Sequence, residues 1–207
     1  MVHCTLTVFP GPGPEGGSPM ALKDLICEEI RCEHLVQDQW IDFRRSAYRF
    51  PDGRVFEPYY SYTRRDYAVV VASDEAGSYL CVRQFRQGIK AVTTEFPAGG
   101  IERKDGEAST MEQALSAAKR ELLEETGYES DCWSHLLTIP SQATLSDNLA
   151  WIFRAENCRP AASQKLDDME LLDIRKCSAE EIEAMIFSGR FQQAVHVTAW
   201  LLAGRKA

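Results

Sequence analysis

One stretch, Gly106 to Tyr128, constrains the fold of this chain more than any other, because it has the pattern of a single amphipathic helix. Apolar residues recur within it at helical spacing, at Met111, Leu115, Ala118 and Leu122. Ser109 is the expected N-cap, and Gly127 stands where a glycine would end the helix. We therefore predict one helix across this stretch.

Three glutamates lie close together near the end of the predicted helix. Glu121 and Glu125 are four residues apart and share a face, and Glu124 lies beside them. Carboxylates packed this tightly repel one another unless something neutralises them. Oxygen ligands suit a hard divalent cation, so the sequence predicts a site for Mg²⁺ or Mn²⁺.

A helix rich in glutamate also has a simpler explanation, which stays open. Such helices are usually solvated faces with pairs such as Arg120 to Glu124. Ser109 and Glu112 have the spacing of a capping box, which explains Glu112 as well as a metal site does. For the two glutamates that share a face, the combined spacing favours the metal interpretation.

The spacing of the whole stretch resembles the Nudix box, the signature of hydrolases that cut a nucleoside diphosphate linked to another group. The matching positions are Gly106, five residues, Glu112, seven residues, Arg120-Glu121-Leu122, one residue, Glu124-Glu125, one residue, Gly127 and Tyr128. One departure is that the Gly-Gly pair of the family falls earlier, at Gly99-Gly100, so we interpret Ile101 to Thr110 as a lengthened loop. The resemblance implies an α/β (α+β) fold, a Nudix α/β/α sandwich with a mixed sheet, plus an N-terminal antiparallel β region.

The residues that enter the box indicate a branch of the family. Glu95-Phe96-Pro97-Ala98-Gly99-Gly100 resembles the corresponding segment of ADP-ribose and related nucleotide-sugar pyrophosphatases. The resemblance implies that the backbone carbonyl of Ala98 is a metal ligand, together with Glu121, Glu125 and Glu124. It also implies that the Glu95 side chain lies at the metal and phosphate site.

Two arginines precede this segment, in Arg83-Gln84-Phe85-Arg86, which resembles an Arg-Gln-aromatic-Arg segment of the same branch. The resemblance implies that Arg86 contacts a phosphate, and a guanidinium suits this role because its fork meets two phosphate oxygens at once. A surface arginine at a strand end explains Arg86 equally well and explains Arg83 better. Both are candidate substrate-binding residues.

An acidic loop, Gln164 to Glu170, precedes the predicted strand from Leu171 to Arg175. The resemblance implies that Glu170 and Asp168 fall where this branch places a further metal ligand and the catalytic carboxylate. Glu124 of the box is a third candidate for the general base. A merely solvated acidic loop is the alternative.

The order of the remaining segments predicts three parts. Residues 1–20 are expected to be a flexible tail, residues 21–65 an N-terminal β region, and residues 66–207 the Nudix hydrolase domain. We predict a strand from Leu35 to Phe43 and a hairpin at Asp52-Gly53. The resemblance implies that the β region helps to form a homodimer. The alternative is a hairpin that only covers the main domain.

Composition excludes some classes of protein and partner. The net charge of −8 argues against a general nucleic-acid binder, which would show a basic surface. No apolar stretch is long enough to predict a membrane span. The seven cysteines are odd in number and include no Cys-x-x-Cys pair, which favours free thiols in a reducing cytoplasm over a disulfide framework.

The expected function is metal-dependent hydrolysis of ADP-ribose, or of a related nucleoside diphosphate sugar, which for ADP-ribose would give AMP and ribose 5-phosphate. One alternative is a hydrolase of the same fold that acts on a UDP-sugar, GDP-mannose or NADH. The other is a sensor that binds ADP-ribose without cutting it. The intact glutamate cluster argues against the sensor.

Overall fold

A run of buried apolar residues forms the centre of the main sheet. The strand β4 (Tyr67–Asp74) is fully buried from Ala68 to Ala72, and it lies between β10 (Leu149–Pro160) and β5 (Tyr79–Arg86). The structure is a computed structural model that describes residues 21–102, 107–166 and 171–204. Within these ranges it confirms the predicted mixed fold of helices and strands.

The main sheet contains eight strands, and its longest path runs in the order β11, β5, β4, β10, β8. The pairing of β4 with β10 is parallel and the other pairings are antiparallel, so the sheet is mixed. The strands off or at the ends of that path are β6 (Ala91–Glu95), β7 (Ala98–Gly100), β8 (Tyr128–Glu129), β9 (Cys132–Pro140) and β11 (Leu172–Cys177).

The sheet divides between β4 and β5. These two strands pair only at Ala72 with Leu80 and at Ser73 with Tyr79. Beyond that point β7 pairs with β4, and β6 pairs with β5. Only two residues, Phe96 and Pro97, connect β6 to β7, so a very short segment links the two branches.

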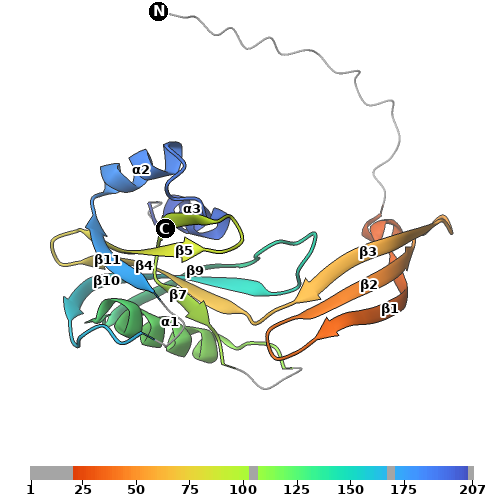
Figure 1. The fold of residues 1–207 in the computed structure, drawn as a ribbon, viewed down its shortest axis with the longest axis horizontal. Helices are drawn as coiled ribbons and strands as arrows, with labels where there is room; N and C mark the ends of the chain where they lie inside the picture. The colour runs from red at the N-terminus through yellow and green to blue at the C-terminus, as the bar shows by residue number, and fades with distance from the viewer. Residues whose placement is uncertain (1–20, 103–106, 167–170, 205–207) are drawn as a thin grey trace, which may run out of the picture.

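Helices cover both faces of this sheet (Figure 1). On one face α1 (Met111–Thr126) packs its buried residues, among them Leu122, against residues of β4, β5 and β10. On the other face α2 (Ala179–Phe187) and α3 (Ala194–Ala203) cover a second core that includes Phe96. None of the helices in the described ranges is long and apolar enough to cross a membrane.

The ends of α1 differ in how well they were predicted. Thr110, and not Ser109, is the N-cap, and it forms a capping box with Gln113. The predicted cap was wrong because the Ser109 hydroxyl instead donates to the carboxylate of Asp66, at 2.6 Å. At the other end Gly127 has a φ of 72° and donates to a carbonyl of the last turn, as predicted.

A separate three-stranded antiparallel sheet lies at one end of the molecule (Figure 1). A short 3₁₀ helix, Leu22–Leu25, precedes its strands, which are β1 (Glu28–Gln37), β2 (Asp42–Arg49) and β3 (Val55–Thr63). The hairpin predicted at Asp52-Gly53 joins β2 to β3 and is confirmed.

The strand predicted from Leu35 to Phe43 was wrong, because this stretch crosses the turn between β1 and β2. The Asp38 carboxylate accepts the backbone N–H groups of Trp40 and Ile41, at 2.7 and 3.0 Å. This turn is closed by a side chain rather than by glycine or proline, so the alternation of apolar and polar residues does not reveal it.

Candidate active site

Two buried carboxylates of α1 meet the backbone of β7. Glu121 and Glu125 are only 6% and 3% exposed. The carboxylate of Glu125 accepts the N–H of Ala98 at 3.0 Å. A Cβ atom at Gly99 would lie 1.9 Å from the carboxyl carbon of Glu121. Two of the three glutamates predicted as metal ligands, Glu121 and Glu125, therefore converge on Ala98-Gly99, the segment predicted to supply a backbone ligand.

Arg120 contacts two of the three glutamates. Its Nη2 donates to the Glu121 carboxylate at 2.6 Å and to the Gly100 carbonyl at 3.0 Å, and its Nη1 donates to Glu124 at 2.7 Å. The ion pair to Glu124, weighed as an alternative from the sequence, is thus present. The repulsion expected among the carboxylates is partly relieved by this guanidinium.

The oxygen atoms that meet between α1 and β7 can be compared with the ligands that the predicted divalent cation prefers. Among the residues that the structure describes, no three His, Cys, Asp or Glu side chains are grouped as a metal site. The converging groups are two buried carboxylates and the oxygen-bearing backbone of β7, where the absence of a side chain at Gly99 makes room for Glu121. Such oxygen donors are of the kind that a hard cation prefers.

Arg86 and Glu95, at the ends of β5 and β6, form a two-point ion pair. Arg86 Nε lies 2.9 and 3.1 Å from the two carboxylate oxygens of Glu95, and Nη2 also donates to Glu95. Glu95 has no exposed surface, and Thr93 donates a further hydrogen bond to it. Burial alone would raise the pKa of Glu95, but hydrogen bonds and the charge of Arg86 outweigh burial and hold that pKa below its usual value.

Arg86 also senses the charge of one glutamate of α1. Burial tends to lower the pKa of Arg86, but Glu95 and Glu125 raise it above its usual value, so Glu125 lies within electrostatic range of the guanidinium. Tyr67 lies in the same range; burial raises its pKa and the charge of Arg86 opposes that rise. Sequence reasoning missed Tyr67, because a residue that begins a buried strand gives no sign of which side chains it meets.

Arg83 is not brought to this site. It pairs with Asp173 across β5 and β11, with Nε 3.0 Å from the carboxylate, and both side chains are about half exposed. Residues 83 and 86 are three apart on one strand, so their side chains point to opposite faces of the sheet. The position of Arg83 therefore matches the alternative of a surface arginine at a strand end, and not a phosphate contact.

The two other predicted catalytic residues, Asp168 and Glu170, lie outside the described residues. The chain just before them is attached to the last turn of α1. The N–H of Lys165 donates to the carbonyl of Glu124 at 2.9 Å, and the Gln164 side chain donates to the carbonyl of Glu125 at 2.7 Å.

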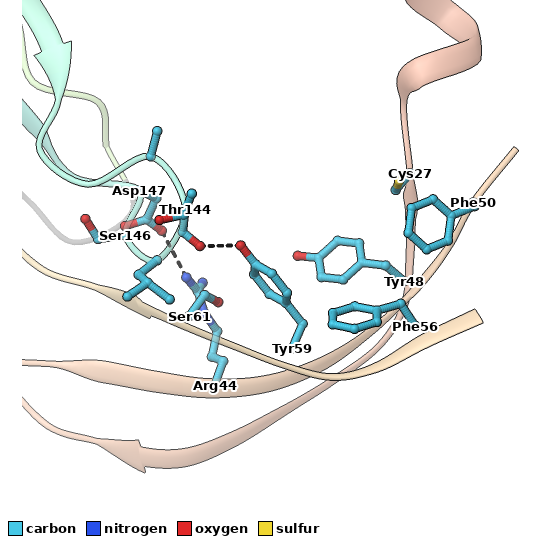
Figure 2. Close-up of a pocket in the computed structure, with 12 residues that line it drawn as sticks. Cys27, Arg44, Tyr48, Phe50, Phe56, Tyr59, Ser61, Thr144, Ser146 and Asp147 are labelled. Carbon is cyan, nitrogen blue, oxygen red and sulfur yellow. Dashed lines mark hydrogen bonds and ion pairs between the residues drawn. The ribbon is translucent and has the colours of Figure 1, made fainter. Parts of the chain in front are cut away.

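A pocket of about 670 Å³ lies between the N-terminal sheet and the loop before β10 (Figure 2). Figure 2 shows two links across it: the Tyr59 hydroxyl donates to the Thr144 carbonyl, and Arg44 pairs with Asp147 at 3.1 Å. Its aromatic lining residues are Tyr48, Phe50, Phe56 and Tyr59. None of the residues predicted from the sequence to bind phosphate or metal lines this pocket.

Comparison with known proteins adds to this geometry. A model of the NUDIX domain matches residues 63–200. The chain is 24% identical over 168 residues to the "ADP-ribose pyrophosphatase" of Bacillus subtilis (strain 168), an alignment that covers 81% of this chain and 86% of that protein. It is 30% identical over 137 residues to the "ADP-sugar pyrophosphatase" of Mus musculus, covering 53% of this chain and 60% of the mouse protein.

A solved structure described as "Crystal structure of ADP compounds hydrolase" has the same fold. It superposes on this chain with a TM-score of 0.71, at 19% sequence identity, and covers 86% of this chain and 91% of its own. The overall fold of this chain is therefore one already seen in a crystal structure.

Proposed function

This chain belongs to the NUDIX domain family, and from that membership we propose that it hydrolyses the diphosphate bond of ADP-ribose or a related nucleoside diphosphate sugar. With ADP-ribose the products would be AMP and ribose 5-phosphate. The observation that carries the proposal is the convergence of Glu121 and Glu125 on the backbone of Ala98-Gly99, with Arg86 in electrostatic range.

The choice of substrate class is supported by the relatives. The names of the Bacillus subtilis and mouse proteins are ADP-ribose pyrophosphatase and ADP-sugar pyrophosphatase, and the former aligns over 81% of this chain. The segment Glu95 to Gly100, which resembles the nucleotide-sugar branch, occupies the division of the sheet where the candidate site lies. Substrate specificity among nucleoside diphosphate sugars would come from loops and from a partner subunit.

A divalent cation is part of the proposal, and we expect Mg²⁺. When bound, such an ion neutralises phosphate charge and lowers the pKa of a coordinated water. Glu121, Glu125, Glu124 and the Ala98 carbonyl would hold it. Arg120 would then have to share Glu121 and Glu124 with the cation, because its guanidinium now donates to both.

Arg86 would hold the substrate diphosphate. Glu95 engages its Nε and Nη2, and Nη1 makes no hydrogen bond to any residue that the structure describes. A guanidinium fixed along one edge presents the other edge to an anion without losing much side-chain freedom. In this proposal Glu95 orients the arginine and Arg86 meets the phosphate.

A carboxylate would take the proton of the attacking water. Asp168 and Glu170 remain the first candidates, and Glu124 is the third. The support for the first two is the attachment of Lys165 to the carbonyl of Glu124, since Lys165 is three residues before Asp168 in the chain. General-base catalysis of this kind typically contributes on the order of 10²- to 10⁴-fold in rate.

The aromatic pocket of Figure 2 is proposed as the place of the nucleoside base. Its walls include Tyr48, Phe56 and Tyr59, whose rings already meet edge to face at 5.5 and 6.1 Å. Aromatic walls suit a flat base because ring stacking adds to the burial of apolar area. Ser141, at the other end of the loop that lines the pocket, lies beside Tyr67 of the phosphate site.

Two further parts of the proposal concern the environment of the protein. We propose a homodimer formed through the N-terminal sheet, because β1 is exposed along its whole length. We also propose a cytoplasmic location, because the six cysteines in the described ranges are free thiols.

The test is phosphate release, coupled to a phosphatase, over a panel of ADP-ribose, UDP-glucose, GDP-mannose and NADH. Each substrate is assayed with Mg²⁺ and with EDTA, for the wild type, for Glu125→Gln and for Glu183→Gln as a control. Glu183 is exposed on α2, on the opposite face of the sheet from α1. Turnover of ADP-ribose that needs Mg²⁺, is lost in Glu125→Gln and is kept in Glu183→Gln is the expected result.

Other outcomes separate the alternatives. Turnover of a different member of the panel keeps the chemistry and replaces the substrate. If no substrate is cut but calorimetry shows tight binding of ADP-ribose, the protein is a sensor and the enzyme proposal fails. Mg²⁺-dependent activity that survives in Glu125→Gln would remove that glutamate from the metal site.

A further inference from the structure

His196 on α3 contacts the segment between β6 and β7 from outside the candidate site. Its side chain is 3% exposed, and its Nδ1 accepts the backbone N–H of Phe96 at 3.1 Å, although the two residues are 100 apart in the sequence. Because Nδ1 is the acceptor, the ring carries its proton on Nε2 and is neutral. Burial, which lowers the pKa of His196 to about 4, agrees with a neutral ring.

The N–H of Phe96, which donates to His196, is the one backbone N–H group in the connection between β6 and β7. Phe96 and Pro97 are the only residues between β6 and β7, and proline has no N–H. Phe96 has no exposed surface, so water cannot replace the histidine as a partner. The Pro97 carbonyl, in the same connection, also has a partner: it accepts the N–H of Val70 at 2.9 Å.

The two ends of this connection carry the two halves of the candidate site. Glu95, directly before Phe96, holds Arg86. Ala98, directly after Pro97, donates to the carboxylate of Glu125. A backbone rotation at Phe96 would therefore move the arginine pair and the glutamate contact relative to each other.

We propose that His196 is a positioning residue for the hydrolysis: its Nδ1 holds the Phe96 N–H and thereby fixes the distance between the Arg86–Glu95 pair and the Glu121–Glu125 carboxylates. The proposal rests on the proposed function of the site. His196 touches neither substrate nor cation in this account and acts only through the backbone.

His196 could instead serve only to fill space in the core. Two substitutions distinguish this packing role from the positioning role. The ring lies nearly parallel to that of Phe96, with centroids 6.4 Å apart, so it also fills space in the core. His196→Leu keeps most of the volume and removes the acceptor. His196→Asn removes the ring but retains an oxygen near the position of Nδ1.

The first experiment compares steady-state kinetics of these two variants with the wild type, using ADP-ribose and Mg²⁺. Positioning predicts that His196→Leu lowers kcat by about 10- to 100-fold with little change in KM, and that His196→Asn regains most of it. Val195→Ala, a buried neighbour on α3, is the control for lost packing and should keep its kcat. Equal losses in both histidine variants, or wild-type kcat in His196→Leu, would overturn the proposal.

A second experiment tests the proposal without any substrate. Hydrogen exchange of the Phe96 amide, followed by NMR, should become at least about tenfold faster in His196→Leu and stay near the wild-type rate in His196→Asn. Slow exchange in His196→Leu would show that the histidine does not hold this amide. If the wild type cuts no member of the substrate panel, the proposed function fails, and this exchange rate still decides whether His196 fixes the connection.

Discussion

The Glu121 carboxylate occupies the space that a side chain at residue 99 would fill. A Cβ there would meet the carboxyl group at 1.9 Å, well inside van der Waals contact, so Gly99→Ala must displace Glu121. We expect this substitution to lower kcat by about 100-fold, because small displacements of catalytic groups cost factors of that size. Kinetics with ADP-ribose and Mg²⁺ measures it.

The neighbouring glycine provides a matched control. A Cβ at Gly100 would have no atom within 4 Å, so Gly100→Ala should keep wild-type kcat and stability. Urea unfolding of both variants shows whether the folded state is intact. A fully active Gly99→Ala would mean that the position of Glu121 does not matter for the reaction.

His196 makes the stability of the fold depend on pH in a defined window. Its pKa is about 4 in the folded protein, against an ordinary value of 6.5, because burial disfavours the charged ring; Glu95 opposes this shift and Arg86 adds to it. The unfolded chain therefore binds a proton that the folded chain does not between these two values. Stability is fully present above pH 6.5 and falls as the pH drops toward 4, by an amount on the order of 3 kcal/mol.

Urea unfolding of the wild type and His196→Asn at pH 7.5 and pH 4.5 tests this dependence. The variant lacks the titrating ring, so its stability should fall less than that of the wild type over the same interval. Equal losses in the two proteins would contradict the lowered pKa of His196.

Several residue contacts in the site were beyond prediction from the sequence. The spacing of Glu121 and Glu125 on one helix was enough to predict that they share a face. The pairing of Arg86 with Glu95 depends on the register of the β5–β6 hairpin, which no local pattern of residues specifies. The contact of His196 with Phe96 spans 100 positions and depends on how α3 packs on the sheet.

At the scale of elements, two features determine where α1 ends: the backbone conformation of Gly127 and its close contact with the chain at Ala161 and Ala162. Gly127 has a φ of 72°, and a Cβ on it would lie 2.3 Å from the carbonyl oxygen of Ala162. Gly127→Ala therefore carries backbone strain and also pushes away Ala161 and Ala162, whose N–H groups donate to the Gly127 carbonyl. We expect it to lower the free energy of unfolding by roughly 3 kcal/mol, as measured in urea.

Gly77 is the control for backbone strain without a steric clash, because its φ is 81° and a Cβ there would meet nothing within 4 Å. Gly77→Ala should cost only about 1 to 2 kcal/mol. If both alanine variants lose the same stability, the contact of Gly127 with Ala162 contributes nothing.

Elements with their own local signal were predicted well, and those defined by single side chains were not. The helix α1 follows from a long apolar pattern, which survives small local exceptions. The turn at Asp38 and the cap at Thr110 each depend on a few hydrogen bonds between side chains and the backbone. Neighbouring polar residues compete for such bonds, so the sequence alone does not show which one forms.

At the scale of the whole molecule, the N-terminal sheet exposes several large apolar side chains. Val36 and Trp40, at the turn end of β1, are 49% and 65% exposed, and Val55 and Phe56 of β3 are about half exposed. A three-stranded sheet needs a covered apolar face to be stable in water. We expect light scattering to give the mass of two chains for the wild type.

Lysines should disrupt this interface. The double variant Val36→Lys, Trp40→Lys is expected to have the mass of one chain, because two charges would have to be buried on association. Phe187→Lys is the control, since Phe187 is 91% exposed but lies on α2, outside the N-terminal sheet. A wild type with the mass of one chain would contradict the dimer.

The two-residue connection of Phe96 and Pro97 also limits how this gene can change in length. Side chains alternate between the faces of a strand, so one inserted codon between Glu95 and Ala98 would turn β7 over relative to β6. The residues that meet α1 would then face α3. Point substitutions in β6 and β7 can be selected one at a time, but a single-residue insertion here would break both halves of the site at once, so natural variants should keep this spacing fixed.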